Sequence, residues 1–366
     1  MRILLLSLLL LGPMTAVCDQ EDPRLTRFDA LVREYRVEND VLSLSYAIVR
    51  DGEILALEGI GWQDHDAEEP TTADTSYLAA SITKTFTGTT LMAMDADGHI
   101  DLDDAFTSLS DWPRRCAWLS GSGSVFGGGT ATTSGYIPPA IDCEAEISVR
   151  HVLQMRVLGE PGSNFLYNPV VFGRLANWVE ERTGRPYRDW VRHYVIEPAK
   201  LTDTAAGWRD PNAGNARLNI APPFRHAPEQ DDNLAPSVLP NTEMNASSGI
   251  IGSAGELARY AIALDAGDIL DPDLLRTMWT PPLEASGEPA SYAYGWWVQT
   301  WQGHKIVWHG GWWPDAYAGL LLKVPEQRLG LVLLGNTDGL NWPNRLHVAE
   351  VEKHSLARAF LEMFVE

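Results

Sequence analysis

The stretch "YLAASITKTF", residues 77–86, places a serine and a lysine three positions apart, Ser81 and Lys84, among apolar and hydroxylic side chains. The chain has 28 lysine and arginine residues together, and only five of them are lysines. Arginine carries nearly all the positive charge elsewhere, so a position that needed only a charge would be expected to hold arginine. Lysine differs from arginine because it can lose its proton and act as a base.

The segment from Ile82 to about Asp97 is predicted to be a largely buried helix that ends at Gly98. Residues i and i+3 share a helix face, so Ser81 and Lys84 are expected to be neighbours. A serine hydroxyl needs an adjacent base to attack a carbonyl, and a lysine can be that base if burial lowers its pKa. By itself the pair is equally compatible with a helix-capping serine and a lysine that extends to solvent.

Composition excludes several classes of partner. The 366-residue chain has a formal net charge of −21, and such a field repels nucleic acid and anionic lipid. Its 45% hydrophobic and 21% charged residues are typical of a globular protein. The cysteines and histidines show no zinc-ligand spacing, and no His-Glu-x-x-His motif occurs. We therefore expect no metal and no cofactor.

The N-terminal residues 1–18 are typical of a secretory signal peptide. An arginine precedes a short apolar run, and small residues at Ala16 and Cys18 precede a cleavage site before Asp19. The mature protein is expected to be exported, periplasmic or secreted, without a transmembrane helix. Acylation of Cys18 is the alternative, and the bulky Val17 before it disfavours lipid anchoring.

Two cysteines follow that segment, Cys116 and Cys143. In an oxidising compartment an even pair favours a disulfide, which would close the glycine- and serine-rich loop 116–143. Two separate buried thiols are the alternative.

Predicted strands flank a helical middle. Apolar runs on both sides of Asp51-Gly52 predict a hairpin, and four strand-like runs follow residue 290. We predict an α+β fold, with an antiparallel sheet built from the N- and C-terminal segments, 19–104 and 245–366, and flanked by helices. Residues 105–244 are expected to form an all-helical inserted lobe. A cleft between the lobes is the natural place for a site.

Five stretches, in order, resemble the class C β-lactamase-like serine hydrolases. This family includes penicillin-binding proteins, D,D-carboxypeptidases, D-aminopeptidases and esterases. The similarity extends over about residues 40–336 and implies the β-lactamase/transpeptidase-like fold. The stretches are "YLAASITKTFTGTTLMAMDADGHIDLDD" (77–104), "ISVRHVLQM" (147–155), "PGSNFLYNPVVFGRLANWVEERTG" (161–184), "NASSGIIGSAGELARYA" (245–261) and "HKIVWHGGWWPDAYAGLLLKVPEQRLGLVLLGN" (304–336).

The resemblance implies catalytic roles for three side chains. Ser81 would be the acylated nucleophile and Lys84 its proton partner. Tyr167 falls on the tyrosine of the family's Tyr-x-Asn motif, and a neighbouring lysine ammonium would lower the pKa of its phenol.

A second group would bind the substrate. His309-Gly310-Gly311 falls on the family's Lys-Thr-Gly or His-x-Gly motif, and His309 would bring a partly cationic hydrogen-bonding group to the cleft. Gly311 would let the strand backbone approach the substrate. The backbone N–H groups of Ser81 and Trp312 would form an oxyanion hole.

Two departures from the family pattern bear on the substrate. The motif's asparagine is replaced by Pro169, and the only asparagine, Asn168, comes one position early as a candidate substrate contact. Histidine replaces the motif lysine. A histidine suits esters or neutral acyl groups at least as well as carboxylates. Tryptophans 296, 297, 312 and 313 would line an apolar acyl pocket or belong to the core.

The expected function is hydrolysis of a small-molecule ester or amide through an acyl-enzyme, with an esterase favoured. A D-amino-acid amidase, a D,D-carboxypeptidase or a β-lactamase is the alternative. A pseudoenzyme that binds cell-wall peptide or a protein partner is the alternative of another class. The sequence does not indicate an oligomeric state.

Overall fold

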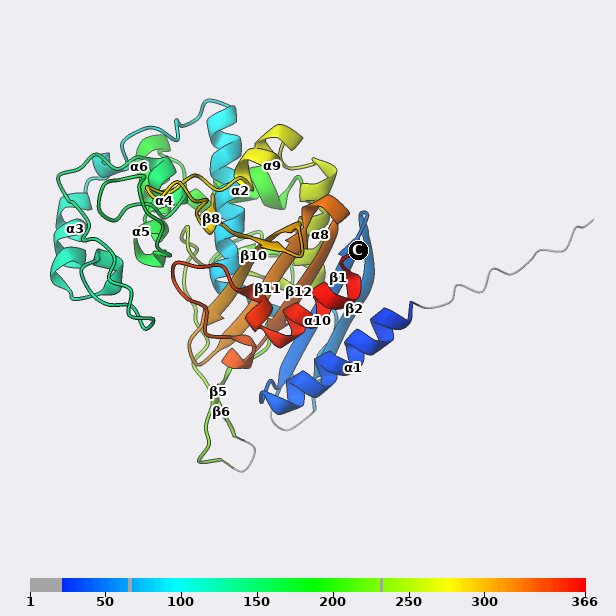
Figure 1. Ribbon diagram of the computed structural model, residues 1–366. Helices are drawn as coiled ribbons and strands as arrows, with labels where there is room; N and C mark the ends of the chain where they lie inside the picture. The colour runs from blue at the N-terminus through cyan, green and yellow to red at the C-terminus, as the bar shows by residue number, and fades with distance from the viewer. Residues whose placement is uncertain (1–21, 65–67, 231–232) are drawn as a thin grey trace, which may run out of the picture.

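The computed structural model describes residues 22–64, 68–230 and 233–366. The predicted signal peptide and the alternative lipid site at Cys18 lie outside these residues. The centre of the fold is a seven-stranded antiparallel sheet with the order β2-β1-β12-β11-β10-β9-β8 (Figure 1). Its strands are β1 Ser43–Arg50, β2 Glu53–Gly61, β8 Tyr292–Ala293, β9 Trp296–Trp301, β10 His304–Trp313, β11 Tyr317–Val324 and β12 Leu329–Gly335.

The two ends of the chain share this sheet, as the sequence predicts. Strand β1 pairs with β12, from Leu44 opposite Gly335 to Arg50 opposite Leu329. The β1–β2 hairpin turns at Asp51 and Gly52, which have φ angles of 52° and 87°. Two successive left-handed residues are what a tight hairpin turn requires, so the predicted turn is confirmed.

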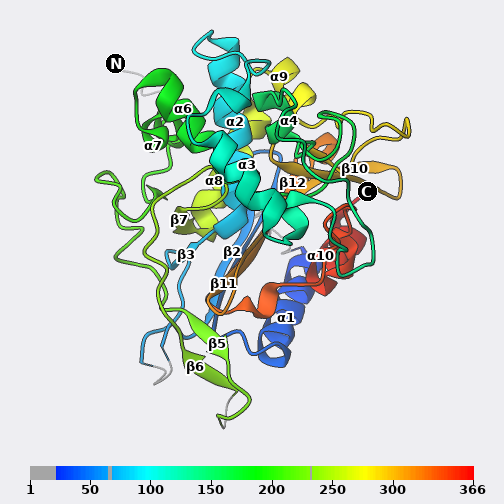
Figure 2. The same ribbon diagram turned by 90° about the vertical axis from the view of Figure 1, so that its left-hand side faces the viewer.

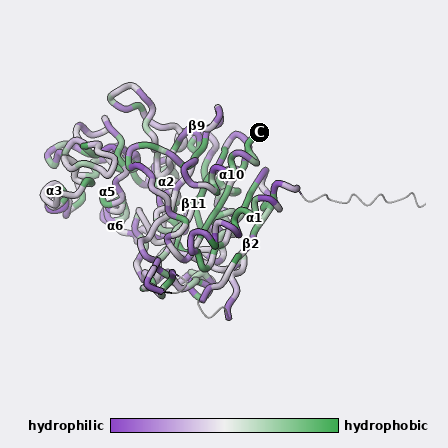
Figure 3. Tube along the Cα trace, turned by 60° about the horizontal axis from the view of Figure 1, so that its bottom comes forward, coloured by the Kyte–Doolittle hydropathy of each residue, from purple (hydrophilic) through white to green (hydrophobic). Residues whose placement is uncertain are grey.

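Helices cover both faces of the sheet. Helices α1 (Pro23–Glu38) and α10 (Ser355–Phe364) pack together on one face, and α8 (Ala254–Ala266) lies on the other (Figure 2). Every residue of β11 and of β12 is buried, because side chains on both faces are covered. Figure 3 shows hydrophobic residues gathered along these strands and hydrophilic residues along the outer loops.

Helix α2 (Thr83–Ala96) lies between the sheet and the mainly helical part of the molecule. Twelve of its residues are buried, although five of them are threonines. Three of these hydroxyls donate to backbone carbonyls: Thr85 to Ile82 at 2.9 Å, Thr87 to Ala246 at 2.7 Å and Thr89 to Thr85 at 2.9 Å. A threonine-rich helix can therefore be buried without leaving these donors unpaired.

The segment 105–244 is mostly helix and loop, but it is not all-helical as expected. Short strands β5 and β6 form a two-stranded ribbon, and β4 joins β3 and β7 in a second sheet. Strands of two or three residues are too short to leave a periodic pattern in the sequence. The remaining elements are α3 Trp112–Gly121, α4 Val149–Leu153, α5 Pro169–Gly173, α6 Leu175–Thr183, α7 Tyr187–Val191, a π-helical turn Arg192–Ile196, α9 Pro272–Met278, β3 Ser76–Leu78, β4 Ala205–Ala206, β5 Phe224–His226, β6 Leu234–Pro236 and β7 Ile250–Ser253.

The predicted disulfide is present between Cys116 and Cys143. The loop that it closes carries its own hydrogen bonds, including Gly129 N–H to Pro138 O at 2.8 Å and Ile141 N–H to Gly127 O at 2.9 Å. The alternative of two separate thiols is wrong. In the described part of the chain, no helix has the length and apolar character needed to span a bilayer.

Replacing both cysteines by alanine should lower the free energy of unfolding by roughly 3–4 kcal/mol, because the unfolded chain regains the entropy of an open 27-residue loop. Urea denaturation of parent and variant measures this difference. A reductant should destabilise the parent and leave the double variant unchanged. Equal stability of the two proteins without reductant would contradict the prediction.

Candidate active site

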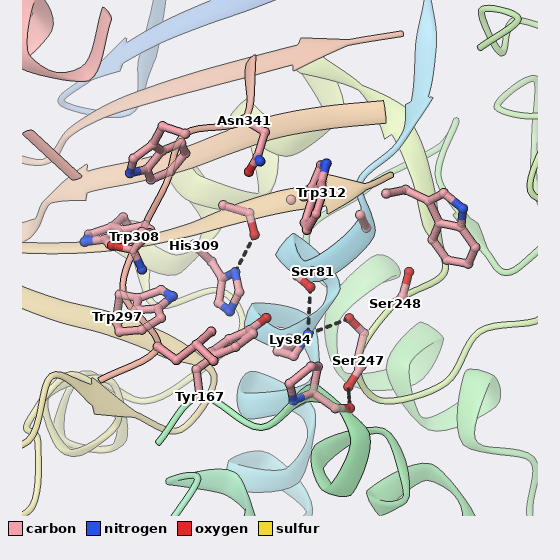
Figure 4. A pocket seen from close by; sticks show the side chains of 18 of the residues that line it. Ser81, Lys84, Tyr167, Ser247, Ser248, Trp297, Trp308, His309, Trp312 and Asn341 are labelled. Atoms are coloured by element: carbon pink, nitrogen blue, oxygen red, sulfur yellow. Dashed lines mark hydrogen bonds between the residues drawn. The ribbon is translucent and has the colours of Figure 1, made fainter. Parts of the chain in front are cut away.

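A cavity of about 550 Å³ opens where β10 passes the start of α2. Its walls also include the chain before α5, the turn before β7, and a loop, 341–346, that follows the last sheet strand. Figure 4 shows the Ser81 and Lys84 side chains pointing toward each other inside it, with Tyr167 and His309 on one side and Ser247 on the other. The structure thus gathers most of the predicted site residues in one place.

Ser81 lies in a 3₁₀ turn, η1 (Ala80–Ile82), directly before α2. Ala80 has a φ angle of 45°, a left-handed conformation that a non-glycine residue adopts only under constraint. Such strain is concentrated at functional positions in proteins. Here the strained residue directly precedes Ser81, which lines the cavity.

Lys84 is the best-defined polar group of the site. Its Nζ lies 2.8 Å from the Ser81 Oγ and donates to the Ser247 carbonyl at 3.0 Å. The residue is fully buried, so the interpretation of a lysine that extends to solvent is wrong. Burial lowers the pKa of its amine well below the ordinary value of 10.5, because the charged form loses its hydration. A neutral amine beside a hydroxyl can accept the hydroxyl proton.

Tyr167 lies beside this pair, with its ring centre 5.2 Å from the Lys84 Nζ. Burial raises the pKa of its phenol, and the Ser81 side chain opposes that effect only in part. The expectation of a lowered pKa is therefore wrong, because burial of the phenol has the larger effect on its pKa. Tyr167 keeps its proton and can act as a hydrogen-bond donor or proton relay.

His309 is buried in β10 with both ring nitrogens occupied. Its Nδ1–H donates to the Gly310 carbonyl at 2.7 Å, since a carbonyl can only accept, and its Nε2 lies 3.1 Å from the Tyr292 hydroxyl. Burial holds the pKa of His309 well below 6.5, because the charged form of the ring would lose its hydration. The expected partly cationic histidine is therefore a neutral one, because the enclosing aromatic side chains exclude water.

Gly311 allows β10 to approach the nucleophile segment. A Cβ at this position would lie 2.3 Å from the Ala79 carbonyl oxygen, two residues before Ser81. The next residue, Trp312, lines the cavity and is 49% exposed. Close packing of β10 against η1 brings Trp312 and Ser81 to facing walls. The oxyanion hole formed by their N–H groups stays a prediction.

Asn168 does not line the cavity. It is almost fully buried, its Oδ1 accepts from the Val171 N–H at 3.1 Å, and its Nδ2 donates to the Phe126 carbonyl at 2.8 Å. The expected substrate contact is wrong, because this amide caps α5 and holds a neighbouring loop. Pro169 occupies the cavity wall instead, and its carbonyl accepts from the Ser247 hydroxyl at 2.6 Å.

Several lining residues were missed by sequence reasoning. Ser247 belongs to the recognised segment 245–261, yet only the fold shows that its carbonyl orients Lys84. Phe126 and the loop 341–346 belong to no motif, so nothing in their spacing indicates the site. Ser248 contributes a buried hydroxyl that has no hydrogen-bond partner.

The cavity wall is aromatic and nearly uncharged. Tyr167, Trp297 and Trp308 form a stack, with ring centres 5.4 Å and 5.3 Å apart. Trp312 and Trp313 also line the cavity, whereas Trp296 is fully buried against Trp279 in the core. Among the lining residues that the structure describes there is no carboxylate and no arginine. Within the same described ranges, His, Cys, Asp and Glu form no cluster suited to a metal ion.

The Beta-lactamase family model matches residues 28–354 of this chain. The chain is 24% identical over 305 residues to a D-aminopeptidase of Gluconobacter oxydans (strain 621H), covering 79% of this chain and 55% of that protein. It is 23% identical over 325 residues to Protein flp of Staphylococcus aureus (strain COL), covering 85% and 62% respectively. The chain therefore spans just over half of the length of these curated relatives.

Solved structures show the same fold. An octameric penicillin-binding protein homologue from Pyrococcus abyssi superposes with a TM-score of 0.69 and 20% identity, over 87% of this chain and 74% of that one. EstCE1, a hydrolase with promiscuous acyltransferase activity, superposes with a TM-score of 0.65 and 16% identity, over 92% of this chain and 98% of that one. A D-amino acid amidase from Ochrobactrum anthropi SV3 superposes with a TM-score of 0.65 and 21% identity, over 93% of this chain and 99% of that one.

Gly311→Ala should lower the free energy of unfolding by about 1–3 kcal/mol, because the new methyl group overlaps a backbone oxygen that cannot move freely. Thermal or urea unfolding measures the change. Gly121→Ala is the matched control, since a Cβ there meets nothing within 4 Å. A Gly311→Ala protein as stable as its parent would show that β10 is not tightly packed against η1.

Lys84→Met should raise the free energy of unfolding at pH 7. The folded-state pKa of Lys84 lies below that of the unfolded chain, so the unfolded state binds the proton more tightly and folding is penalised. At a pH below both pKa values, the parent loses about 1.4 kcal/mol of unfolding free energy for each unit by which the folded-state pKa lies below the unfolded-state pKa. Above about pH 10.5 the amine is neutral in both states, so this penalty vanishes. The advantage of the variant should therefore shrink as pH rises toward 10.5.

Urea denaturation between pH 6 and pH 10 tests this trend. Lys353→Met is the control, because its side chain is 48% exposed and pairs with Glu350 at the surface. A difference in stability between Lys84→Met and the parent that stays constant from pH 6 to pH 10 would contradict the prediction.

Proposed function

Because this chain belongs to the β-lactamase family of serine hydrolases, we propose that it hydrolyses a neutral ester or amide through an acyl-enzyme on Ser81. The observation that carries the proposal is the 2.8 Å contact between the Ser81 hydroxyl and a fully buried lysine amine. Burial keeps this amine in the state that accepts a proton.

Acylation follows from this geometry. The Ser81 Oγ attacks the substrate carbonyl carbon as its proton passes to the Lys84 Nζ. The negative charge on the carbonyl oxygen is stabilised by the N–H groups of Ser81 and Trp312. The intermediate collapses with cleavage of the bond to the alcohol or amine, which leaves with a proton from Lys84, directly or through the Tyr167 hydroxyl.

Deacylation reverses the proton path. A water molecule gives a proton to Lys84 as its oxygen attacks the acyl carbon, and the Ser81 oxygen leaves with that proton. The products are a carboxylic acid and the regenerated serine. No cofactor takes part in this scheme.

The charge of the cavity supports a neutral substrate. Lys84 and His309 are both held neutral by burial, and no arginine lies among the lining residues that the structure describes. A substrate carboxylate, as in a β-lactam or a C-terminal peptide, would find no fixed positive charge there. The aromatic stack at Trp297 and Trp308 favours an apolar group, so an esterase leads.

A D-amino-acid amidase or aminopeptidase is the second candidate, supported by the D-aminopeptidase and the D-amino acid amidase among the relatives. Such substrates carry a free ammonium group, and the described lining residues include no carboxylate to receive it. A non-catalytic binding protein is disfavoured by the close contact between Ser81 and Lys84, although Pro169 departs from the family motif.

We also propose export into the periplasm or the medium. The disulfide Cys116–Cys143 supports this, because such bonds persist in oxidising compartments. Mass spectrometry of the exported protein should find a mature N-terminus at Asp19. A protein that keeps residues 1–18 and stays in the cytoplasm would overturn the proposal.

A fluorophosphonate should add to the Ser81 peptide, and Ser81→Ala should abolish both the adduct and ester turnover. Lys84→Arg should lower kcat/KM by roughly 10²–10⁴-fold, since a guanidinium keeps the charge but cannot take a proton. Lys305→Arg, remote from the cavity lining, is the matched control. The readouts are the adduct mass and p-nitrophenyl ester hydrolysis, and absence of both in the parent would sink the enzyme hypothesis.

The substrate class is tested on the same protein with p-nitrophenyl esters, D-amino-acid amides and a labelled penicillin. We expect the esters to have the highest kcat/KM. Stable penicillin acylation without ester turnover would overturn the neutral-ester assignment. Faster hydrolysis of D-amino-acid amides would establish the second candidate instead.

A further inference from the structure

We infer that the disulfide-closed loop 116–143 sets the size of the substrate through one side chain, Phe126, and that Asn168 is the positioning residue that holds it. The inference rests on the proposed function, because it assigns the specificity of the same cavity. It also gives a role to the asparagine that stands one position away from its place in the family motif.

Phe126 is the residue of this loop that lines the cavity, and its side chain is partly buried against the core. It lies in a 3₁₀ turn, η3 (Val125–Gly127), whose first backbone groups are bonded locally: the Ser124 hydroxyl accepts from the Phe126 N–H at 3.3 Å. The Ile141 N–H donates to the Gly127 carbonyl at 2.9 Å. The turn is thus joined to the returning half of the loop.

Close packing leaves this turn little freedom. A Cβ on Gly127 would lie 2.2 Å from the Leu119 carbonyl oxygen, and one on Gly128 would lie 1.9 Å from the Pro139 carbonyl oxygen. Two glycines are therefore needed where the turn presses on α3 and on the chain before Cys143. The disulfide joins the same two regions. The backbone around Phe126 is consequently held in place by this packing and by the disulfide.

Asn168 connects the turn that carries Phe126 to the cavity residues Tyr167 and Pro169. Its Nδ2 donates to the Phe126 carbonyl at 2.8 Å, and its neighbours in sequence, Tyr167 and Pro169, both line the cavity. The side chain is almost completely buried, so loss of this bond would leave the Phe126 carbonyl without its partner. One amide therefore fixes the position of Phe126 relative to the ring of Tyr167.

A second attachment holds the loop to the segment that carries Leu346. Tyr136 of the disulfide loop stacks on His347, with ring centres 4.8 Å apart. His347 follows Leu346, which lines the cavity and whose carbonyl accepts from the Tyr167 N–H at 2.7 Å. The disulfide loop is thus attached both to the segment of Asn168 and to the segment of Leu346, and the inference is that the Phe126 ring limits the size of the group that fits in the cavity.

A smaller and a larger side chain at position 126 should shift the preferred substrate size in opposite directions. Phe126→Ala removes the ring and should shift the preferred substrate toward larger groups, whereas Phe126→Trp should shift it toward smaller ones. A single methylene in an apolar pocket changes kcat/KM by roughly tenfold or more, so shifts of that size are expected between adjacent members of a series. Opposite shifts cannot come from partial unfolding, which would lower all rates together.

Asn168→Ser separates positioning from capping. Serine is a good helix N-cap and keeps an acceptor for the Val171 N–H, but it is too short to reach the Phe126 carbonyl. This variant should shift the preference in the same direction as Phe126→Ala, and it should raise KM for the preferred ester more than it changes kcat. Ile137→Ala is the matched control, because Ile137 lies on the same loop, is 63% exposed and does not line the cavity.

The experiment measures kcat/KM of the full chain for two series: p-nitrophenyl esters of increasing acyl length, and acetate esters of alcohols of increasing size. A shift of the optimum in either series with Phe126→Ala and Phe126→Trp supports the inference and shows which part of the substrate meets the ring. Unchanged optima in both series, or an equal shift with Ile137→Ala, would overturn it.

Fluorophosphonate labelling of Ser81 in every variant distinguishes failure of the Phe126 specificity role from failure of the proposed function. Labelling and ester turnover in the parent, with no shift in the Phe126 variants, would overturn the specificity wall and leave the proposed function intact. A parent that is neither labelled nor active would overturn both.

Discussion

The site depends on the burial of one amine. Lys84 has no access to solvent, and the polar groups within its reach are the Ser81 hydroxyl and the Ser247 carbonyl. Neither group is an anion that could stabilise an ammonium, so the neutral amine is favoured. The same burial raises the pKa of Tyr167 and lowers that of His309. A water-poor cavity thus leaves three titratable side chains uncharged around one serine.

The rest of the fold keeps that amine enclosed. Helix α2 carries Lys84 between the sheet and the helical segment, and three of its buried threonines bond to backbone carbonyls instead of water. Gly311 lets β10 press against the carbonyl before Ser81, and the disulfide-closed loop adds Phe126 to the wall. These contacts cost stability, because a buried amine and a left-handed alanine are both unfavourable by themselves. Protein stability is commonly reduced at functional sites in this way.

Some predictions from the sequence depended only on local chemistry, and these agree with the structure. The hairpin at Asp51-Gly52 needs two left-handed residues in succession, and both residues have positive φ angles. The i, i+3 spacing of Ser81 and Lys84 places their side chains in contact. Predictions that depended on the surroundings fared worse. The charge states expected of Tyr167 and His309 were wrong, because solvent exclusion by distant segments decides them.

The sequence by itself determined the sheet with strands from both ends of the chain, the disulfide and the contact between Ser81 and Lys84, because each is encoded by local periodicity, turn chemistry or residue type. Only the tertiary structure decided what surrounds that pair. The Asn168 side chain bonds to the Phe126 carbonyl and does not line the cavity, and the loop 341–346 forms part of the cavity wall, although neither has a local signal for that role. Long-range packing sets these positions, and with them the burial that lowers the pKa of Lys84.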